Sequence, residues 1–271
     1  MKQLTLPNGD KIYYIDKLTA IDIYEEIYVE NEYLRQGIKV KDNDVIFDIG
    51  ANIGLFSRYV ATKAKNLQIF TFEPVPIIFE VLEKNLRNLP AEVRNYNVGL
   101  AERKGITEIH YYPKVSADSA ITEFDWDLKV EQYFQNYNET VVKWIPISKI
   151  VPKFMRKSVI KKGLKNLYKS ELVACKLRTI SDIIQENNIE TINLMKIDAE
   201  NYEFQVLAGI NQSDWDKIQQ ISMEVHEHIE GGNHLLHRIT KMLEDKGFHV
   251  EKEEDGRFSL MGVYMLYAIR P

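Results

Sequence analysis

The chain has 271 residues, of which 45% are hydrophobic and 28% charged, with a formal net charge of -5 at pH 7. This length and apolar content are enough for one large domain with a sizeable core. The negative balance argues against general nucleic-acid binding. Because the sequence holds one cysteine, Cys175, and no apolar run of membrane-spanning length, we expect a soluble cytoplasmic protein without a disulfide or membrane contact.

The first 42 residues are predicted to form a hairpin and a helical cap ahead of the main domain. Residues 4–15 predict a small hairpin that turns at Asn8 and Gly9, since both central residues of a tight hairpin turn need positive φ. Residues 18–36 place apolar side chains at helical spacing and precede Gly37, a common helix stop. We therefore expect one helix over residues 18–36.

Short apolar runs then alternate with segments of helical spacing. Such a pattern predicts an α/β fold with a mostly parallel sheet and helices on both faces. The expected strands cover residues 45–49, 68–72, 93–98, 192–197 and 220–225, and a last long strand lies within 255–271. Ligands of such sheets bind beyond the carboxyl ends of the strands, so the site is expected at that edge.

The turn after the first strand carries two glycines, in the sequence VIFDIGANIGLFS. Gly50 and Gly54 let the backbone approach a ligand closely, and a helix beginning near Ile53 would present free N–H groups. The spacing G-x-N-x-G departs from the G-x-G-x-x-G of dinucleotide sites. The second strand ends at Glu73, whose carboxylate can accept both hydroxyls of a ribose. These features predict a ribose-bearing cofactor without a pyrophosphate.

Four segments, in this order, resemble the FkbM-type family of S-adenosylmethionine-dependent methyltransferases. They are FDIGANIGLFS at 47–57, FEP at 72–74, NVGL at 97–100, and KIDAENYEFQVLAGI with QISMEVHE at 196–227. The resemblance extends to members from polyketide and peptide synthases, which methylate hydroxyl groups. It implies a Rossmann-like class I fold with a seven-stranded mixed sheet, an antiparallel last strand and S-adenosyl-L-methionine as cofactor. Asn201 departs from the Asp-x-Glu-Gly pattern of many members.

The resemblance also assigns residues to the cofactor. Asp48, Gly50, Asn52 and Gly54 would surround its methionine part, Glu73 would hold its ribose, and Asn97 and Val98 would line its adenine. The alternative for the glycines is an ordinary strand-to-helix turn. The alternative for Val98 is a place in the core.

A hydroxyl acceptor needs a group that takes its proton, and two strand ends offer candidates. His226 is the expected general base, because histidine titrates near neutral pH. Glu224 on the same strand, or Asp198 on the neighbouring one, would orient it. The alternative for His226 is a hydrogen-bonded histidine at a strand end. Glu200 is expected on the acceptor side. For both Glu200 and Asp198, binding of the cofactor's ammonium group or capping of the following helix are alternatives.

A divalent metal is an alternative for the same histidine-rich region. The set would extend His226 by His228, His234 and His237. Their spacing fits no established metal template, so we expect no metal.

An insertion over residues 113–176 is too long for a plain loop. Its first half is acidic and aromatic and is expected to fold over the site as a lid, with Ser119 approaching the acceptor. Its second half places lysines every four residues beside apolar side chains, as in a basic amphipathic helix. These are Lys153, Lys157, Lys161, Lys165 and Lys169. The helix face is either solvated or a docking face for an acidic acyl or peptidyl carrier protein, with an anionic membrane as the rival.

The resemblance and these residues together imply O-methylation of a hydroxyl on a polyketide or peptide natural-product intermediate, free or bound to a carrier protein. Residues 43–112 would form the cofactor-binding half and residues 177–271 the acceptor-side half. Two other classes of protein stay open. One is an NAD-dependent oxidoreductase on a related sheet, and the other is a non-catalytic docking module with a methyltransferase fold.

Overall fold

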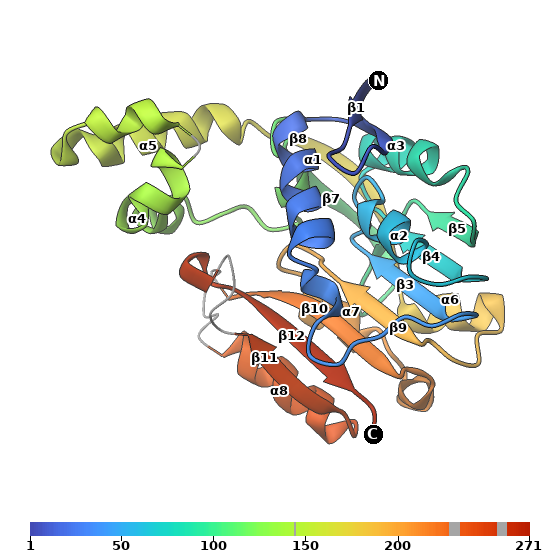
Figure 1. Ribbon diagram of the computed structural model, residues 1–271. Helices are drawn as coiled ribbons and strands as arrows, with labels where there is room; N and C mark the ends of the chain where they lie inside the picture. The colour runs from blue at the N-terminus through green and yellow to red at the C-terminus, as the bar shows by residue number, and fades with distance from the viewer. Residues whose placement is uncertain (144, 228–233, 254–258) are drawn as a thin grey trace.

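The computed structural model describes residues 1–143, 145–227, 234–253 and 259–271. Its centre is a seven-stranded mixed sheet with the order β11-β12-β10-β9-β3-β4-β5 (Figure 1). The strands are β3 (Val45–Ile49), β4 (Gln68–Phe72), β5 (Glu92–Tyr96), β9 (Leu194–Ile197), β10 (Gln220–His226), β11 (His249–Glu253) and β12 (Val263–Ile269). β12 runs antiparallel between β10 and β11, and the remaining pairings are parallel. The predicted mixed sheet and antiparallel last strand are confirmed.

Helices cover both faces of this sheet, as predicted. One face carries α6 (Ile180–Asn187), α7 (Glu203–Ala208) and α8 (Leu235–Asp245), and the other carries α1 (Lys17–Tyr24), α2 (Leu55–Val60) and α3 (Pro76–Leu86). The neighbours Ile46 and Phe47 of β3 are both fully buried and belong to opposite cores. This two-sided burial explains why the strand is apolar at every position except Asp48. Within the described ranges, every helix falls short of the length and apolar character that a bilayer crossing requires.

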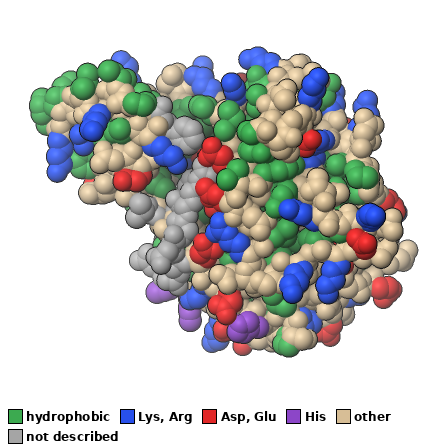
Figure 2. Space-filling model, in the orientation of Figure 1, with side chains coloured by type: hydrophobic (Ala, Val, Ile, Leu, Met, Phe, Trp, Pro, Cys, Tyr) green, Lys and Arg blue, Asp and Glu red, His purple; other side chains and the backbone are tan. Residues whose placement is uncertain are grey.

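A second, three-stranded sheet carries the insertion. Its strands are β6 (Gly99–Leu100), β7 (Gly105–Tyr111) and β8 (Glu171–Arg178), so the last residues of the expected insertion belong to β8. Between β7 and β8 the chain forms α4 (Trp126–Gln135) and α5 (Lys153–Leu167). These helices stand away from the main sheet as a lobe, on which hydrophobic and basic side chains lie together (Figure 1 and Figure 2). α5 is the predicted amphipathic helix, with Ile160 and Leu164 buried.

The N-terminal hairpin differs from the prediction at its turn. β1 (Lys2–Thr5) and β2 (Lys11–Tyr14) pair antiparallel as expected. Gly9 has a φ of 92°, but Asn8 is not in the positive-φ region. The tight turn with two positive-φ residues is therefore wrong, and a longer loop joins the strands.

The expected helix over 18–36 ends earlier than predicted. α1 continues through one wider turn at Glu25–Val29 and stops. Asn31 then takes a left-handed backbone with a φ of 53°, and its side-chain oxygen accepts a hydrogen bond from the hydroxyl of Tyr59 at 2.8 Å. This contact fixes a turn that leads into a short helix at Glu32–Leu34. The hydroxyl of Tyr33 in that helix donates to Asp198, just beyond the end of β9, at 3.1 Å.

Candidate active site

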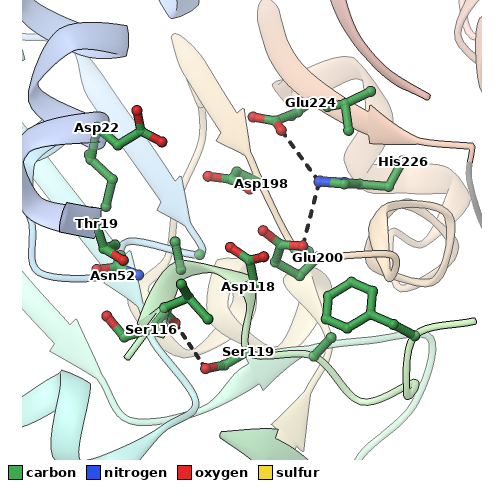
Figure 3. Close-up of a pocket in the computed structure, with 18 of the residues that line it drawn as sticks. Thr19, Asp22, Asn52, Ser116, Asp118, Ser119, Asp198, Glu200, Glu224 and His226 are labelled. Atoms are coloured by element: carbon green, nitrogen blue, oxygen red, sulfur yellow. Dashed lines mark hydrogen bonds and ion pairs between the residues drawn. The ribbon is translucent and has the colours of Figure 1, made fainter. Parts of the chain in front are cut away.

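A cavity of about 1000 Å³ lies beyond the carboxyl ends of β3, β4, β9 and β10. These strand ends form its inner wall, and α1 and the α4–α5 lobe form its outer wall. Its polar side chains include Thr19, Asp22, Asn52, Ser116, Asp118, Ser119, Asp198, Glu200, Glu224 and His226 (Figure 3). The cavity therefore lies at the sheet edge that the sequence predicts.

The turn after β3 presents backbone to the cavity. Gly50, Asn52 and Gly54 have φ values of 68°, 48° and 85°. A Cβ atom on Gly50 would lie 1.7 Å from the carbonyl oxygen of Asp198, so only glycine fits where this turn meets the end of β9. The closeness of two chain segments, as well as access for a ligand, thus explains this glycine.

The N–H groups of this turn are already bonded within the protein. The following helix begins at Leu55, and the N–H groups of Gly50, Asn52 and Ile53 donate to Phe72, Glu73 and the Asn52 side chain. The helix thus begins two residues later than predicted, and the N–H groups of the turn before it are not free. Leu55 and Phe56, the first residues of the helix, line the cavity, and contact of their N–H groups with a ligand stays a prediction.

Glu73 stands at the end of β4 with 5% of its surface exposed. Its carboxylate accepts the N–H of Val75 at 2.9 Å and the N–H of Asn52 at 3.1 Å. Burial raises the pKa of Glu73 from 4.5 to about 7, although these two bonds oppose the rise. Each carboxylate oxygen can accept a further hydrogen bond, so Glu73 can still receive hydroxyl donors from the cavity.

Three residues predicted to touch the cofactor lie behind the cavity wall. Asp48 is fully buried and accepts a hydrogen bond from Ser57 at 2.6 Å. Gly54 packs against α3, and the amide of Asn97 donates to two carbonyl oxygens of the segment after β4. These three residues shape the wall without lining it. Val98, by contrast, lines the cavity and also belongs to the buried core, which was its alternative. Its contact with an adenine stays a prediction.

His226, the last residue of β10, is held by three carboxylates. Its Nδ1 lies 2.7 Å from Oε1 of Glu203. Its Nε2 lies 3.3 Å from Oε1 of Glu224 and 3.5 Å from Oε2 of Glu200 (Figure 3). The predicted pairing of Glu224 with His226 is confirmed. The sequence analysis misses Glu203, because an acid in the first turn of a helix is usually explained by the helix dipole.

The carboxylates also set the charge of His226. Burial disfavours the imidazolium, but Glu200 and Glu203 outweigh burial, and the pKa of His226 is raised well above its ordinary value of 6.5. Burial likewise raises the pKa of Glu200 well above its ordinary value. His226 can accept a proton only when its imidazole is neutral. A positive charge nearby would lower its pKa and so favour that neutral form.

Lys196 forms a second ionic centre, in the middle of β9. The side chain is 3% exposed, and its Nζ donates to the carbonyl oxygen of Gly50 at 2.8 Å. The same Nζ lies 3.1 Å from Asp198 and 3.7 Å from Asp48. The sequence signal for this centre is a lysine inside the apolar run INLMKI.

Asp198 does not take the place predicted for it beside His226. Its carboxylate bonds Lys196 and the hydroxyl of Tyr33, at 3.1 Å each, and Tyr33 also reaches Glu224 at 3.3 Å. The strand β9 ends before Asp198, so the chain turns this carboxylate toward the buried lysine. Glu203 occupies the orienting position instead.

Glu200 and Ser119, predicted on the acceptor side, both line the cavity. Glu200 has a φ of 41° in the turn before α7, and that helix has no side-chain cap, so the capping alternative is wrong. The Ser119 hydroxyl donates to the carbonyl oxygen of Ser116 at 2.9 Å. Contact of either residue with an acceptor stays a prediction.

The metal alternative gains no support from the residues that can be placed. Within the described ranges, no group of three His, Cys, Asp or Glu side chains could hold a metal ion. His234 directly precedes α8 and His237 lies on its exposed side, while His228 is outside the described residues.

Comparisons with known proteins place the chain in a family. Residues 169–250 match the methyltransferase FkbM domain. Over 285 residues the chain is 28% identical to 31-O-demethyl-FK506 methyltransferase FkbM of Streptomyces tacrolimicus, which covers 100% of this chain and 97% of that protein. The chain belongs to the FkbM methyltransferase family. Methyltransferase sdnD of Sordaria araneosa is 28% identical over 251 residues, covering 89% of this chain and 86% of that one.

A third relative of this FkbM-family protein is much longer. AMB antimetabolite synthetase AmbE of Pseudomonas aeruginosa is 30% identical over 275 residues, and the match spans 99% of this chain but 12% of the synthetase. Family membership makes the protein an S-adenosylmethionine-dependent methyltransferase, in place of the oxidoreductase alternative. The residues present fit that donor, since Glu73 offers a buried carboxylate to a ribose beside a turn whose backbone a ligand can approach.

Glu73→Gln is expected to weaken S-adenosylmethionine binding by about 10- to 100-fold, because a charged hydrogen-bond acceptor contributes ~1.5–3 kcal/mol. Hydroxyl donors favour the ionised carboxylate, whose pKa is about 7, so affinity of the unsubstituted protein should fall as pH drops below 7. The variant should lose this pH dependence. Calorimetric titration on both sides of pH 7 tests this, with exposed Glu80→Gln as control. If Glu73→Gln and Glu80→Gln bind S-adenosylmethionine with equal affinity, Glu73 does not bind the ribose.

Proposed function

We propose that this protein transfers a methyl group to a hydroxyl of a polyketide or peptide natural-product intermediate, with His226 as general base. The observation that carries the proposal is that Nε2 of His226 shares one cavity with Glu73 and the turn after β3. The name of the Streptomyces relative, a methyltransferase of 31-O-demethyl-FK506, supports an oxygen acceptor in a natural product. The name of the Pseudomonas relative, an antimetabolite synthetase, supports a biosynthetic setting.

His226 takes the hydroxyl proton at Nε2 as the hydroxyl oxygen attacks. Glu203 holds the proton on Nδ1 and stabilises the imidazolium that results. S-adenosylmethionine supplies a methyl group on a positively charged sulfur, and positive charge in the cavity favours the neutral form of His226. Glu224 orients the ring from the Nε2 side, and Asp198 remains available to an ammonium group. The cavity walls align the acceptor and exclude water, which supplies much of the rate.

We further propose that a carrier protein presents the acceptor at the α4–α5 lobe. Residues 141–170 contain eight lysines and one arginine but no aspartate or glutamate. Lys157 and Lys161 pair with acids of α4, so part of the predicted lysine row holds the lobe together. The docking face is formed by exposed residues at the start of α5 and just before it: Ile147, Lys149, Ile150, Lys153 and Phe154. Its charge is complementary to an acidic partner.

Transfer of labelled methyl to β-hydroxyacyl groups, offered as free pantetheine thioesters or loaded on carrier proteins, tests both steps. We expect methylated oxygen in both formats, with the carrier-bound form preferred. Lys149→Glu with Lys153→Glu should lower kcat/KM for the carrier-bound form by about tenfold, mainly through the association rate. The exposed Lys241→Glu of α8 serves as control.

The outcomes separate the two steps. Labelled nitrogen, or no labelled hydroxyl with any acceptor, would overturn O-methylation. Equal use of free and carrier-bound acceptors, unchanged by the double substitution, would overturn carrier docking. Binding of the docking face to anionic vesicles instead of carrier proteins would assign that face to a membrane.

A further inference from the structure

The cavity continues outward from the strand ends into the α4–α5 lobe. At about 1000 Å³ it is as large as the largest usual small-molecule sites, which span about 300–1000 Å³. There is thus room for a second ligand beside a nucleoside donor. His226 and Glu224 lie at the inner end. The outer part is lined by aliphatic side chains of α5 and α1 together with polar lobe residues such as Lys129, Gln132 and Thr140.

α5 turns one face toward this outer part. Ile160, Gly163, Leu164 and Leu167 are spaced by three or four residues, and all four line the cavity. Ile160 and Leu164 are 5% and 4% exposed, so these two side chains are packed, whereas Gly163 is exposed. Gly163 is the one position on the face without a side chain, and it leaves the cavity wider there.

The glycine at this place has no structural explanation among the described residues. Its φ is not positive, and a Cβ atom built on Gly163 would meet no described atom within 4 Å. At Gly50 and Gly209, by contrast, a Cβ atom would lie 1.7 Å and 2.2 Å from a carbonyl oxygen. Glycine inside a helix lowers helix stability relative to alanine. A helical glycine that neither packing nor backbone requires indicates that the open space itself is used.

The walls around this space indicate what occupies it. Besides α5, the cavity lining includes Leu18 and Ile23 of α1, and Val141 and Ile145 of the lobe. A hydroxyl at the inner end would be close to His226, while the rest of the molecule would extend along these aliphatic side chains.

We propose that the acceptor has an extended apolar body which lies along α5, and that Gly163 determines how long or bulky this body can be. The inference rests on the proposed hydroxyl methylation and adds the class of acceptor to it. A side chain at position 163 would fill the outer cavity and shorten the acceptors that the enzyme accepts.

The test compares Gly163→Leu and Gly163→Trp with Lys162→Trp, which adds the same bulk on the exposed side of α5. β-Hydroxybutyryl-pantetheine and β-hydroxymyristoyl-pantetheine serve as short and long acceptors. Gly163→Trp should lower kcat/KM for the long acceptor about tenfold or more relative to the short one, as filled apolar pockets do. Lys162→Trp should keep the original preference. Calorimetry gives the affinity for the long thioester without turnover, and circular dichroism confirms folding.

Each result decides something. A wild-type enzyme that methylates both thioesters, with a preference that neither Gly163 variant changes, overturns the inference and leaves the proposed function standing. A wild type that binds the long thioester but methylates no hydroxyl overturns the proposed function, and loss of that binding in Gly163→Trp would still support the apolar site. Unchanged binding in that variant would overturn the site as well. Gly163→Leu, with its smaller side chain, decides the question if the tryptophan variant fails to fold.

Discussion

His226→Ala is expected to lower kcat for methyl transfer to a hydroxyl by about two to four powers of ten, the usual contribution of a general base. The variant removes the imidazole that Glu203, Glu224 and Glu200 hold at the inner end of the cavity. Binding of S-adenosylmethionine should change much less than kcat, because Glu73 and the turn after β3 are untouched. Single-turnover rates with labelled methyl, together with calorimetric titration of the donor, measure the two effects separately.

The pH profile gives a second measure of the same role. The base must be neutral to accept a proton, so kcat should rise with pH through the pKa of His226, which lies above its ordinary value of 6.5. Glu203 raises this pKa, so Glu203→Gln should move the inflection to lower pH. The ion pair between protonated His226 and Glu203 also stabilises the fold. That stability is fully present below pH 6.5 and is lost as pH rises through the pKa of the folded state.

The exposed His237→Ala on α8 is the matched control for loss of a histidine. Full activity of His226→Ala with an unchanged pH profile would contradict the role of His226 as general base. The hydroxyl proton would then pass to water or to a carboxylate. A rate loss without any shift of the inflection in Glu203→Gln would show that Glu203 supports the fold and does not tune His226.

The bounds of strands that are buried on both faces could be predicted closely from the sequence. β3 and β4 have the predicted bounds, 45–49 and 68–72, since a strand buried on both faces is a continuous apolar run in the sequence. The N-terminal helix could not be predicted to its end, because its stop depends on Asn31 and on a hydrogen bond from Tyr59, which is 28 residues away. Tertiary contacts of this kind leave no local pattern.

The site residues likewise include some that could be predicted from the sequence and some that could not. Gly50, Glu73 and Glu224 could be found because they stand at or beside strand ends, where side-chain direction follows from the strand. Glu203 reaches His226 through an irregular turn at Glu200 and Asn201, whose φ values are 41° and 69°. Asparagine is among the residues that tolerate the backbone at position 201. No periodicity predicts which side chain this turn brings to the histidine.

Lys196→Met is expected to reduce the free energy of unfolding by about 3–5 kcal/mol, because removing one partner leaves buried charge uncompensated. Asp48 is fully buried, and among the described atoms its Oδ1 has no hydrogen-bond donor while Lys196 lies 3.7 Å away. Burial disfavours the lysine charge, but Asp198 and Asp48 outweigh it and raise the pKa of Lys196, so the lysine is charged at neutral pH. The loss would be a large part of a typical stability of about 5–15 kcal/mol.

Urea unfolding of five proteins tests whether this energy belongs to the ion pair: the unsubstituted protein, Lys196→Met, Asp48→Asn, the double variant and Lys241→Met. Lys196→Met with Asp48→Asn should be more stable than Lys196→Met alone, since the second change removes the uncompensated carboxylate. Burial already raises the pKa of Asp48, and losing the lysine raises it further, so the deficit of Lys196→Met should shrink as pH falls and Asp48 takes a proton. Exposed Lys241→Met should stay within about 0.5 kcal/mol of the unsubstituted protein. Additive losses in the double variant, with no pH dependence, would mean that the lysine stabilises β9 through its packing and not through its charge.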